Sequence, residues 1–243
     1  MTRTPYPIPF LALALASCSA PAPIIPSSEN LAALRGRPLT ITHYTSKPDF
    51  VAMTAGTAAF GIIGALAQIA EGNDLIEKNN VPDPADTISA RLAAAYQARY
   101  DADRPSTTTE LASYSSAALP AIVGHDGIIL DVKTTRWMFG YFPLDWGHYH
   151  VDYAASARLV DATTRKEIAR SSCMLKSSDT PDQKPSHDDL TADHAAGLKA
   201  RLDDMAARCA AAFAHDLLGT EGAGPLPGVA GPTNAHAPAT AQR

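Results

Sequence analysis

Residues 127–175 read GIILDVKTTRWMFGYFPLDWGHYHVDYAASARLVDATTRKEIARSSCML. Ile128 to Trp137 and His148 to Val160 are rich in β-branched and aromatic residues and alternate in polarity. A turn-rich tip separates them, which is typical of a long, half-buried hairpin. A second turn at residues 161–165 leads into Lys166 to Met174. The stretch therefore predicts three consecutive antiparallel strands, around which the rest of the chain is organised.

The flanking segments predict further elements of this sheet and its cover. Leu39 to Thr45 alternates in polarity between two prolines, which indicates a short strand that joins the sheet. A helix that begins at Asp83 or Pro84 has one apolar face, which should lie on the sheet. Ser106 to Ala118 combines a threonine run with Glu110, and we expect a second, short helix there.

A long helix is predicted over Leu190 to Leu218, capped by Asp188 or Thr191, with an apolar stripe that includes Cys209. The predicted fold class is α/β (α+β): an antiparallel or mixed sheet with a long hairpin, covered by helices on one face. Residues 39–218 form a single domain in this interpretation. Residues 219–243 are rich in Gly, Pro, Ala and Thr without an apolar period, which predicts a disordered tail.

The segment from Phe50 to Ala70 contains no charged residue. Its length is close to that of a membrane span, but Leu, Ile, Phe, Val and Met hold only a minority of its positions. Three interpretations remain open: a buried or partner-facing helix, a membrane contact, or a glycine-rich loop. The glycines at 56, 61 and 64 would permit close helix approach, and Glu71-Gly72-Asn73 would end the element with a turn.

The first residues have the layout of an export signal. One Arg precedes the apolar run Ile8 to Ala16, and small residues lead up to Cys18. The sequence Leu15-Ala16-Ser17-Cys18 resembles the lipobox of bacterial lipoproteins, in which the cysteine is acylated. Residues 1–17 would then be the signal peptide, and residues 18–38, rich in Pro, Ser and Ala, the lipidated cysteine and a flexible tether. The resemblance implies an outer-membrane lipoprotein that faces the periplasm, with the inner membrane as the alternative.

Two cysteines remain after Cys18, an even number in an oxidising compartment. Cys173 lies at the end of the third strand of the hairpin block and Cys209 lies on the apolar stripe of the long helix, so we predict a disulfide that joins sheet to helix. Two unrelated buried thiols are the alternative. A metal pair is less favoured, because neither cysteine has a further ligand at metal-binding spacing.

Several further segments carry a family resemblance: TAGTAAFG at 54–61, DPA at 83–85, residues 137–153, ARLVD at 157–161, and the two cysteines. Behind a lipobox, this order resembles a group of uncharacterised proteobacterial lipoproteins. In element order the chain is also similar to periplasmic α/β domains such as the TolB amino-terminal domain, LpoB and CsgG. That resemblance implies assembly or activation of an envelope complex rather than catalysis.

Aromatic side chains gather around the hairpin tip. Trp137, Phe139, Tyr141, Phe142 and Trp146 either pack the sheet or form a surface for a protein partner, because Trp and Tyr are favoured interface anchors.

Three polar side chains, His148, His150 and Asp152, alternate along one strand and so share a face. They are either the polar side of a half-exposed sheet or candidate ligands for zinc or another divalent ion. We favour the polar face and expect no cofactor.

Other function classes find little support in the sequence. With 20 basic and 25 acidic residues there is no excess of positive charge for binding nucleic acid. Neither a GxSxG or SxxK nucleophile motif nor a phosphate-binding loop is present. The chain is thus predicted to be a non-catalytic accessory or scaffold lipoprotein with a protein partner. A metal-binding or small-ligand-binding lipoprotein is the alternative, and a hydrolase of envelope material is less favoured.

Replacement of Cys18 by Ser removes the residue that would be acylated. Because each buried methylene of an acyl chain contributes about 0.8 kcal/mol to membrane binding, we expect the variant to move from the membrane fraction to the soluble periplasmic fraction. Immunoblots of fractionated cells measure this, and Ser19→Ala, which keeps the cysteine, should stay in the membrane. Membrane retention of Cys18→Ser would show that the lipobox interpretation is wrong.

Overall fold

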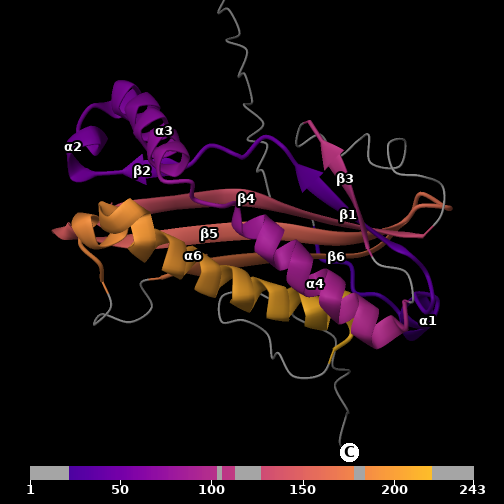
Figure 1. Ribbon diagram of the computed structural model, residues 1–243. Helices are drawn as coiled ribbons and strands as arrows, with labels where there is room; N and C mark the ends of the chain where they lie inside the picture. Colours follow the sequence, from indigo (N-terminus) through magenta and orange to yellow (C-terminus); the bar gives the residue numbers. More distant parts are fainter. Residues whose placement is uncertain (1–21, 103–105, 113–126, 178–183, 221–243) are drawn as a thin grey trace, which may run out of the picture.

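A computed structural model describes residues 22–102, 106–112, 127–177 and 184–220 (Figure 1). Its six-stranded sheet consists of β1 (Leu39–Tyr44), β2 (Val51–Met53), β3 (Thr107–Leu111), β4 (Ile128–Phe142), β5 (Asp145–Asp161) and β6 (Glu167–Lys176). The strand order is β3-β1-β4-β5-β6, and β2 pairs with the tip-proximal half of β4. β4, β5 and β6 are antiparallel, whereas β1 and β2 run parallel to β4. The predicted mixed sheet with a long hairpin is confirmed.

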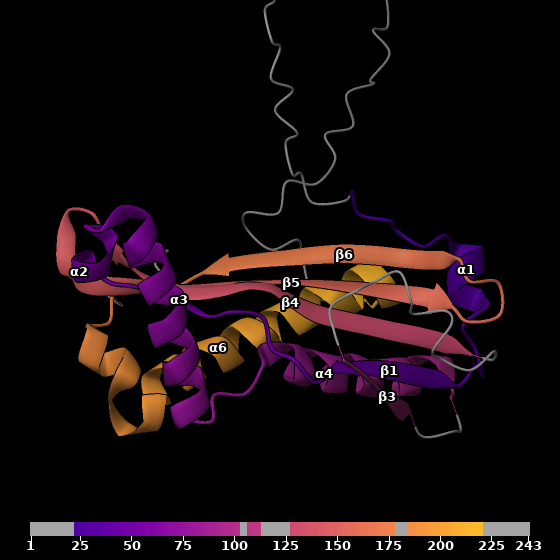
Figure 2. The ribbon, with the colours of Figure 1, turned by 90° about the horizontal axis from the view of Figure 1, so that it is seen from above.

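The helices are α1 (Ser28–Ala32), α2 (Ala55–Ala58), α3 (Gly61–Lys78), α4 (Pro84–Tyr100) and α6 (His187–Leu218). α4 and α6 pack against each other over one face of the sheet (Figures 1 and 2), as the sequence predicted. α4 begins where expected: the Asp83 side chain accepts a hydrogen bond from the backbone N–H of Ala85, and Pro84 fits the first helical position.

An irregularity in the register of β4 decides which side chains enter the core. β4 has 15 residues, and its pairing with β5 shifts between Thr134 and Arg136. Because side chains alternate across a strand, the extra residue moves Trp137 onto the same face as Leu130. Both are buried under the helices, with exposed fractions of 1% and 2%.

The short helix predicted over residues 106–118 is wrong. Thr107–Leu111 is a strand at the edge of the sheet, parallel to β1, and residues 113–118 lie outside the described residues. The Oγ1 atoms of Thr40 and Thr107 are 3.2 Å apart across the two strands. A threonine run can cap a helix, but its β-branched side chains also favour a β-strand. Here the segment forms a strand because it pairs with β1.

The uncharged segment from Phe50 to Ala70 forms three elements instead of one. Val51–Met53 pairs with β4, α2 follows, and α3 continues through the expected turn at residues 71–73 to Lys78. A Cβ atom on Gly64 would lie 1.9 Å from the Thr57 carbonyl oxygen, and one on Gly72 would lie 2.1 Å from that of Phe50. These glycines therefore let α3 approach α2 and β2. In the described part of the chain, no helix is long and apolar enough to cross a membrane.

The segment predicted as a tether, residues 18–38, is packed on the domain from residue 24 onward. The backbone N–H groups of Ile24 and Arg170 each donate to the other residue's carbonyl, at 2.9 Å in both directions. Ser27 caps α1, and Leu34 is fully buried. A flexible tether could therefore include only residues before Ile24. Cys18 and the predicted signal peptide lie outside the described residues, as do residues 221–243 of the predicted tail.

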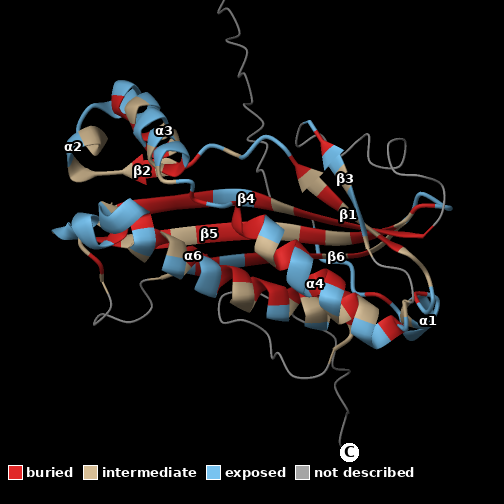
Figure 3. Ribbon diagram, viewed as in Figure 1, coloured by how far each residue is buried: buried red, intermediate tan, exposed pale blue. Residues whose placement is uncertain are grey.

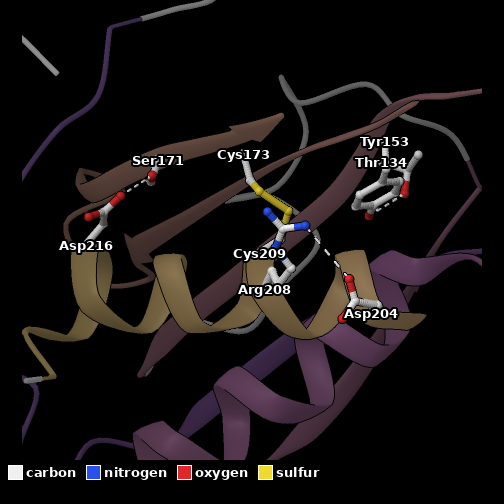
Figure 4. Close-up of a disulfide and its surroundings, with 8 residues drawn as sticks. All are labelled: Thr134, Tyr153, Ser171, Cys173, Asp204, Arg208, Cys209 and Asp216. Atoms are coloured by element: carbon white, nitrogen blue, oxygen red, sulfur yellow. Dashed lines mark hydrogen bonds and ion pairs between the residues drawn. A yellow bond between two sulfur atoms is a disulfide. The ribbon is translucent and has the colours of Figure 1, made fainter. Parts of the chain in front are cut away.

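The predicted disulfide between Cys173 on β6 and Cys209 on α6 is confirmed (Figure 4). Its Cα atoms are 5.6 Å apart, and the bridge spans 36 residues of sequence, which in the chain-entropy model corresponds to roughly 3 to 4 kcal/mol of stabilisation. Ser171 adds a second tie, since its hydroxyl donates to Asp216 of α6 at 2.6 Å. β6 and α6 are thus joined by one covalent link and one hydrogen bond.

The start of α6 differs from the prediction. Ser186, rather than Asp188 or Thr191, is the cap, and it forms a capping box with Asp189. Residues 193–195 have left-handed backbone angles that interrupt the helix. Gly197 fits this fold-back, because a Cβ atom there would lie 1.9 Å from the Asp189 carbonyl oxygen.

An ion pair fastens the chain just before β1 to the far end of β5. Arg37 Nη1 lies 2.7 Å from Asp161 Oδ2, and Arg37 Nη2 donates to the Gly127 carbonyl at 2.9 Å. The hydrogen bond from Arg37 is the largest influence that lowers the pKa of Asp161, to about 2; backbone N–H groups of Thr164 and Thr163 also contribute. Both side chains of the pair are less than a quarter exposed.

Asp161→Asn tests this link through pH. The folded-state pKa of Asp161 lies below its unfolded value, so its stabilisation is present above pH 4 or so and is lost as the pH falls from about 4 to about 2. At pH 7 we expect the variant to lose about 2 kcal/mol of unfolding free energy, and near pH 2 to match the wild type. Urea unfolding at several pH values measures this.

The exposed residue Asp74 provides a control for the pH experiment. It pairs with Lys78 on α3, and both side chains are more than 60% exposed, so Asp74→Asn should leave the unfolding free energy unchanged. An Asp161→Asn variant as stable as the wild type at pH 7 would contradict the role of the Arg37 pair.

Candidate functional site

Of the five aromatic residues predicted to form a partner-binding surface, some are buried in the structure and others lie nearer the surface. Trp137 and Phe139 are each 1% exposed, so their assignment to a partner-binding surface is wrong. Both rings pack edge-on against Phe50, with centroids 5.4 and 5.8 Å away, and the Trp137 indole donates to the Pro48 carbonyl at 2.9 Å. β2 and the segment before it cover these rings, which the sequence pattern of β4 alone could not reveal.

The rest of the predicted aromatic set lies nearer the surface. Tyr141 and Phe142 are half-buried, whereas Trp146 is 68% exposed. Leu144, at the turn between β4 and β5, is completely exposed. The Trp146 indole N–H donates to the Pro143 carbonyl at 2.7 Å, which fixes the ring across the turn.

A second group of exposed apolar side chains lies on α3 and just before it. Phe60, Ile62, Ile63 and Leu66 are 66% to 84% exposed. Gly64, on the opposite side of this helix, faces α2 and is buried. The large side chains of this half of α3 are therefore exposed to solvent, and Figure 3 colours much of this helix as exposed.

The two groups lie at the same end of the sheet (Figures 1 and 2). The register of β2 on β4 pairs Met53 with Gly140, so α2 starts beside the last residues of β4. We call the combined surface the apolar end; its members are Phe60, Ile62, Ile63, Leu66, Leu144 and Trp146. They are six of the nine large apolar side chains that are exposed in the described part of the chain.

The polar trio predicted on β5 is present, but its members form separate pairs. His148 Nδ1 lies 2.7 Å from Asp145 Oδ1, and His150 Nδ1 lies 2.8 Å from Asp152 Oδ1. The bond from His148 is the largest influence that lowers the pKa of Asp145. The described residues contain no group of three or more His, Cys, Asp or Glu side chains that could hold a metal ion.

These polar pairs belong to a set of contacts that holds the hairpin tip against the start of α6. Lys184 Nζ lies 3.7 Å from Asp145 Oδ2 and 4.4 Å from the centre of the Phe142 ring. The Tyr149 backbone N–H donates to the Pro185 carbonyl at 2.8 Å. The exposed side chains of the tip are therefore presented on a fixed backbone.

A cleft of about 330 Å³ lies beside the apolar end, between α3 and the start of α6. Ala52, Leu75 and Phe139 contribute its apolar lining. The polar lining residues are Thr54, Glu71, Asp74, Lys78, Asn79, His187 and Thr191. Sequence reasoning missed this cleft because its walls come from segments more than 100 residues apart.

A buried polar network lies on the sheet face opposite the helices. Asp131, only 2% exposed, accepts hydrogen bonds from Thr42, Tyr44 and Arg158 at 2.7 to 2.8 Å. Burial, followed by the charge of Asp131, raises the pKa of Tyr44. The network joins β1, β4 and β5.

Comparison with known proteins gives only distant similarities. No family model matches the chain, and neither does any curated protein. A Xanthomonas campestris protein of the DUF330 family is similar over 77% of this chain and 88% of its own, with 12% identity and a TM-score of 0.36. Lipoprotein GNA1162 from Neisseria meningitidis is similar over 71% and 96%, with 14% identity and a TM-score of 0.24. These values are too low to assign a function, and the predicted lipoprotein resemblance stays a prediction.

The double variant His148→Ala/His150→Ala tests whether the trio is structural. We expect it to fold with a loss of about 1 to 3 kcal/mol of unfolding free energy, mostly from the half-buried His150–Asp152 pair. Its metal content, measured by mass spectrometry on protein purified without an affinity tag, should equal that of the wild type. Stoichiometric zinc in the wild type that the variant lacks would contradict the structural role.

Proposed function

We propose that this protein is a lipid-anchored, non-catalytic accessory protein of the cell envelope, which binds another envelope protein through its apolar end. The exposure of Phe60, Ile62, Ile63 and Leu66 beside Leu144 and Trp146 is the observation that carries the proposal. Soluble proteins rarely expose such a concentration of large apolar side chains unless it is a binding surface.

The residue types at the centre of the apolar end and around it are typical of protein-binding surfaces. Trp and Phe are common binding anchors, and polar residues surround the apolar centre of most interfaces. Here Asp74 and Lys78 follow on α3, and Lys184 lies at the hairpin tip. Contacts to α6 fix the tip, so little conformational entropy is lost on binding.

The anchoring part of the proposal rests on the sequence. Acylation of Cys18 would attach the chain to the outer membrane, facing the periplasm, with the inner membrane as the alternative. The non-catalytic part also rests on the sequence, in which neither a GxSxG or SxxK nucleophile motif nor a phosphate-binding loop is present.

A photoreactive residue at Ile63 or Trp146, followed by mass spectrometry of the adducts in intact cells, tests the docking surface. We expect the same discrete protein at both positions. Met174, on β6, is the matched control because it is also apolar and 63% exposed; it should not capture that protein. Adducts to lipid alone at Ile63 and Trp146 would contradict a protein partner.

A pair of substitutions quantifies the contribution of α3. Ile62→Ser/Ile63→Ser should reduce the yield of the Trp146 adduct by about tenfold or more, because central anchor residues typically contribute more than 1 kcal/mol each. Both side chains are more than three-quarters exposed, so the fold should be retained, as circular dichroism would show. Met174→Ser should leave the adduct unchanged.

A further inference from the structure

The remaining exposed apolar side chains lie along the outer edge of the sheet, away from the apolar end. Ile24 and Ile25 are 36% and 65% exposed, and Met174 is 63% exposed. β6 is the last strand of the sheet, and the bridge between Ile24 and Arg170 places the N-terminal segment beside it. We call this surface, from Ile24 and Ile25 to Met174, the β6 edge.

The chain length between the anchor and this edge is short. Ile24 is the sixth residue after Cys18, and a fully extended chain spans at most about 3.6 Å per residue, or roughly 20 Å in all. Because Ile24 is held to Arg170 by two hydrogen bonds, an acylated Cys18 would keep the Ile24 end of the β6 edge within that distance of the bilayer.

The apolar end lies farther from the anchor. Arg158 pairs with Arg170 across β5 and β6, and His150, which pairs with Gly140 beside β2, is eight residues away along β5. At about 3.3 Å per residue, the separation between the Ile24 end of the β6 edge and β2 is roughly 26 Å. Met174, which pairs with Ala154, is about half as far away along the strands. The anchored end of the β6 edge is therefore distinct from the apolar end.

Charge at the two ends of β6 fits an anionic surface. Lys166 precedes the strand and Lys176 ends it, and both are exposed, whereas Glu167 is paired with Arg170. Exposed lysines beside apolar side chains are typical of segments that lie at the surface of anionic bilayers, each basic residue adding about 1 kcal/mol.

We infer that the β6 edge lies against the anionic surface of the lipid bilayer, so that the strands run along the membrane and the apolar end projects sideways toward its partner. This inference rests on the acylation of Cys18 in the proposed function. The bilayer is the occupant because the anchor holds this edge beside it.

Single cysteines labelled with an environment-sensitive fluorophore test the orientation. With Cys18 acylated and Cys173 bonded to Cys209, an introduced cysteine is the only free thiol. The full chain as purified from cells, carrying Ile25→Cys, Lys176→Cys or the control Ala94→Cys on the exposed side of α4, is reconstituted into vesicles of phosphatidylethanolamine and phosphatidylglycerol. We expect nitroxide lipids to quench the first two labels about threefold more than the third, since surface segments enter the headgroup region.

A charge-reversal variant tests whether Lys166 and Lys176 contribute to membrane contact. Lys166→Glu/Lys176→Glu should reduce quenching of the label at Ile25, whereas Lys199→Glu on α6 should not. Unchanged quenching would overturn the contribution of the two lysines.

Failure of the inferred orientation can be distinguished from failure of the lipid anchor. Equal, weak quenching at all three sites in a chain that floats with the vesicles would overturn the orientation but leave the anchor in place. Stronger quenching of a label at Ile63→Cys than at Ile25→Cys would also overturn it, by placing the apolar end in the bilayer. A chain that does not float would overturn acylation itself and, with it, the lipid-anchored function.

Discussion

The register shift in β4 at Thr134 to Arg136 is the constraint on which the rest of the structure depends. A regular strand of this length would place its second half with the wrong face toward the helices. At the shift, the Thr134 hydroxyl donates to Asp83 and lies 3.0 Å from the Tyr153 hydroxyl. Asp83 also caps α4. The buried carboxylate of Asp83 thereby links the register shift of β4 to the start of α4, the helix that covers the hairpin.

The second half of β4 in turn positions the apolar end. Only because Trp137 and Phe139 face the core can Phe50 pack against them and bring β2 into register. α2 and α3 follow directly from β2, and Gly72 lets α3 pass close to the Phe50 carbonyl. The location of the exposed face of α3 is therefore a consequence of packing more than 70 residues away in sequence.

Most features that depend on local pattern were predictable, and most that depend on a distant partner were not. Alternation predicted the hairpin, because this signal lies within the strands. The Cys173–Cys209 bridge joins two elements, but it was predictable because only two cysteines follow Cys18 and Cys209 lies on the apolar stripe of the long helix. Thr107–Leu111 was missed since its strand character depends on β1. The segment from Phe50 to Ala70 has no charged residues to mark an exposed face, so its exposed isoleucines became evident only with the fold.

The proposed anchor and the proposed docking surface are attached to the same sheet and the same long helix. The Cys173–Cys209 bridge and the Ser171–Asp216 bond tie β6 to the C-terminal half of α6. At the other end of the sheet, the Tyr149–Pro185 bond ties the hairpin tip to the start of the same helix. Because both surfaces belong to one sheet and one helix, holding the β6 edge at a membrane, as we infer, would also fix the direction in which the apolar end points. With Cys18 acylated as proposed, the short segment before Ile24 would restrict the orientations presented to a partner, which would lower the entropy lost on docking.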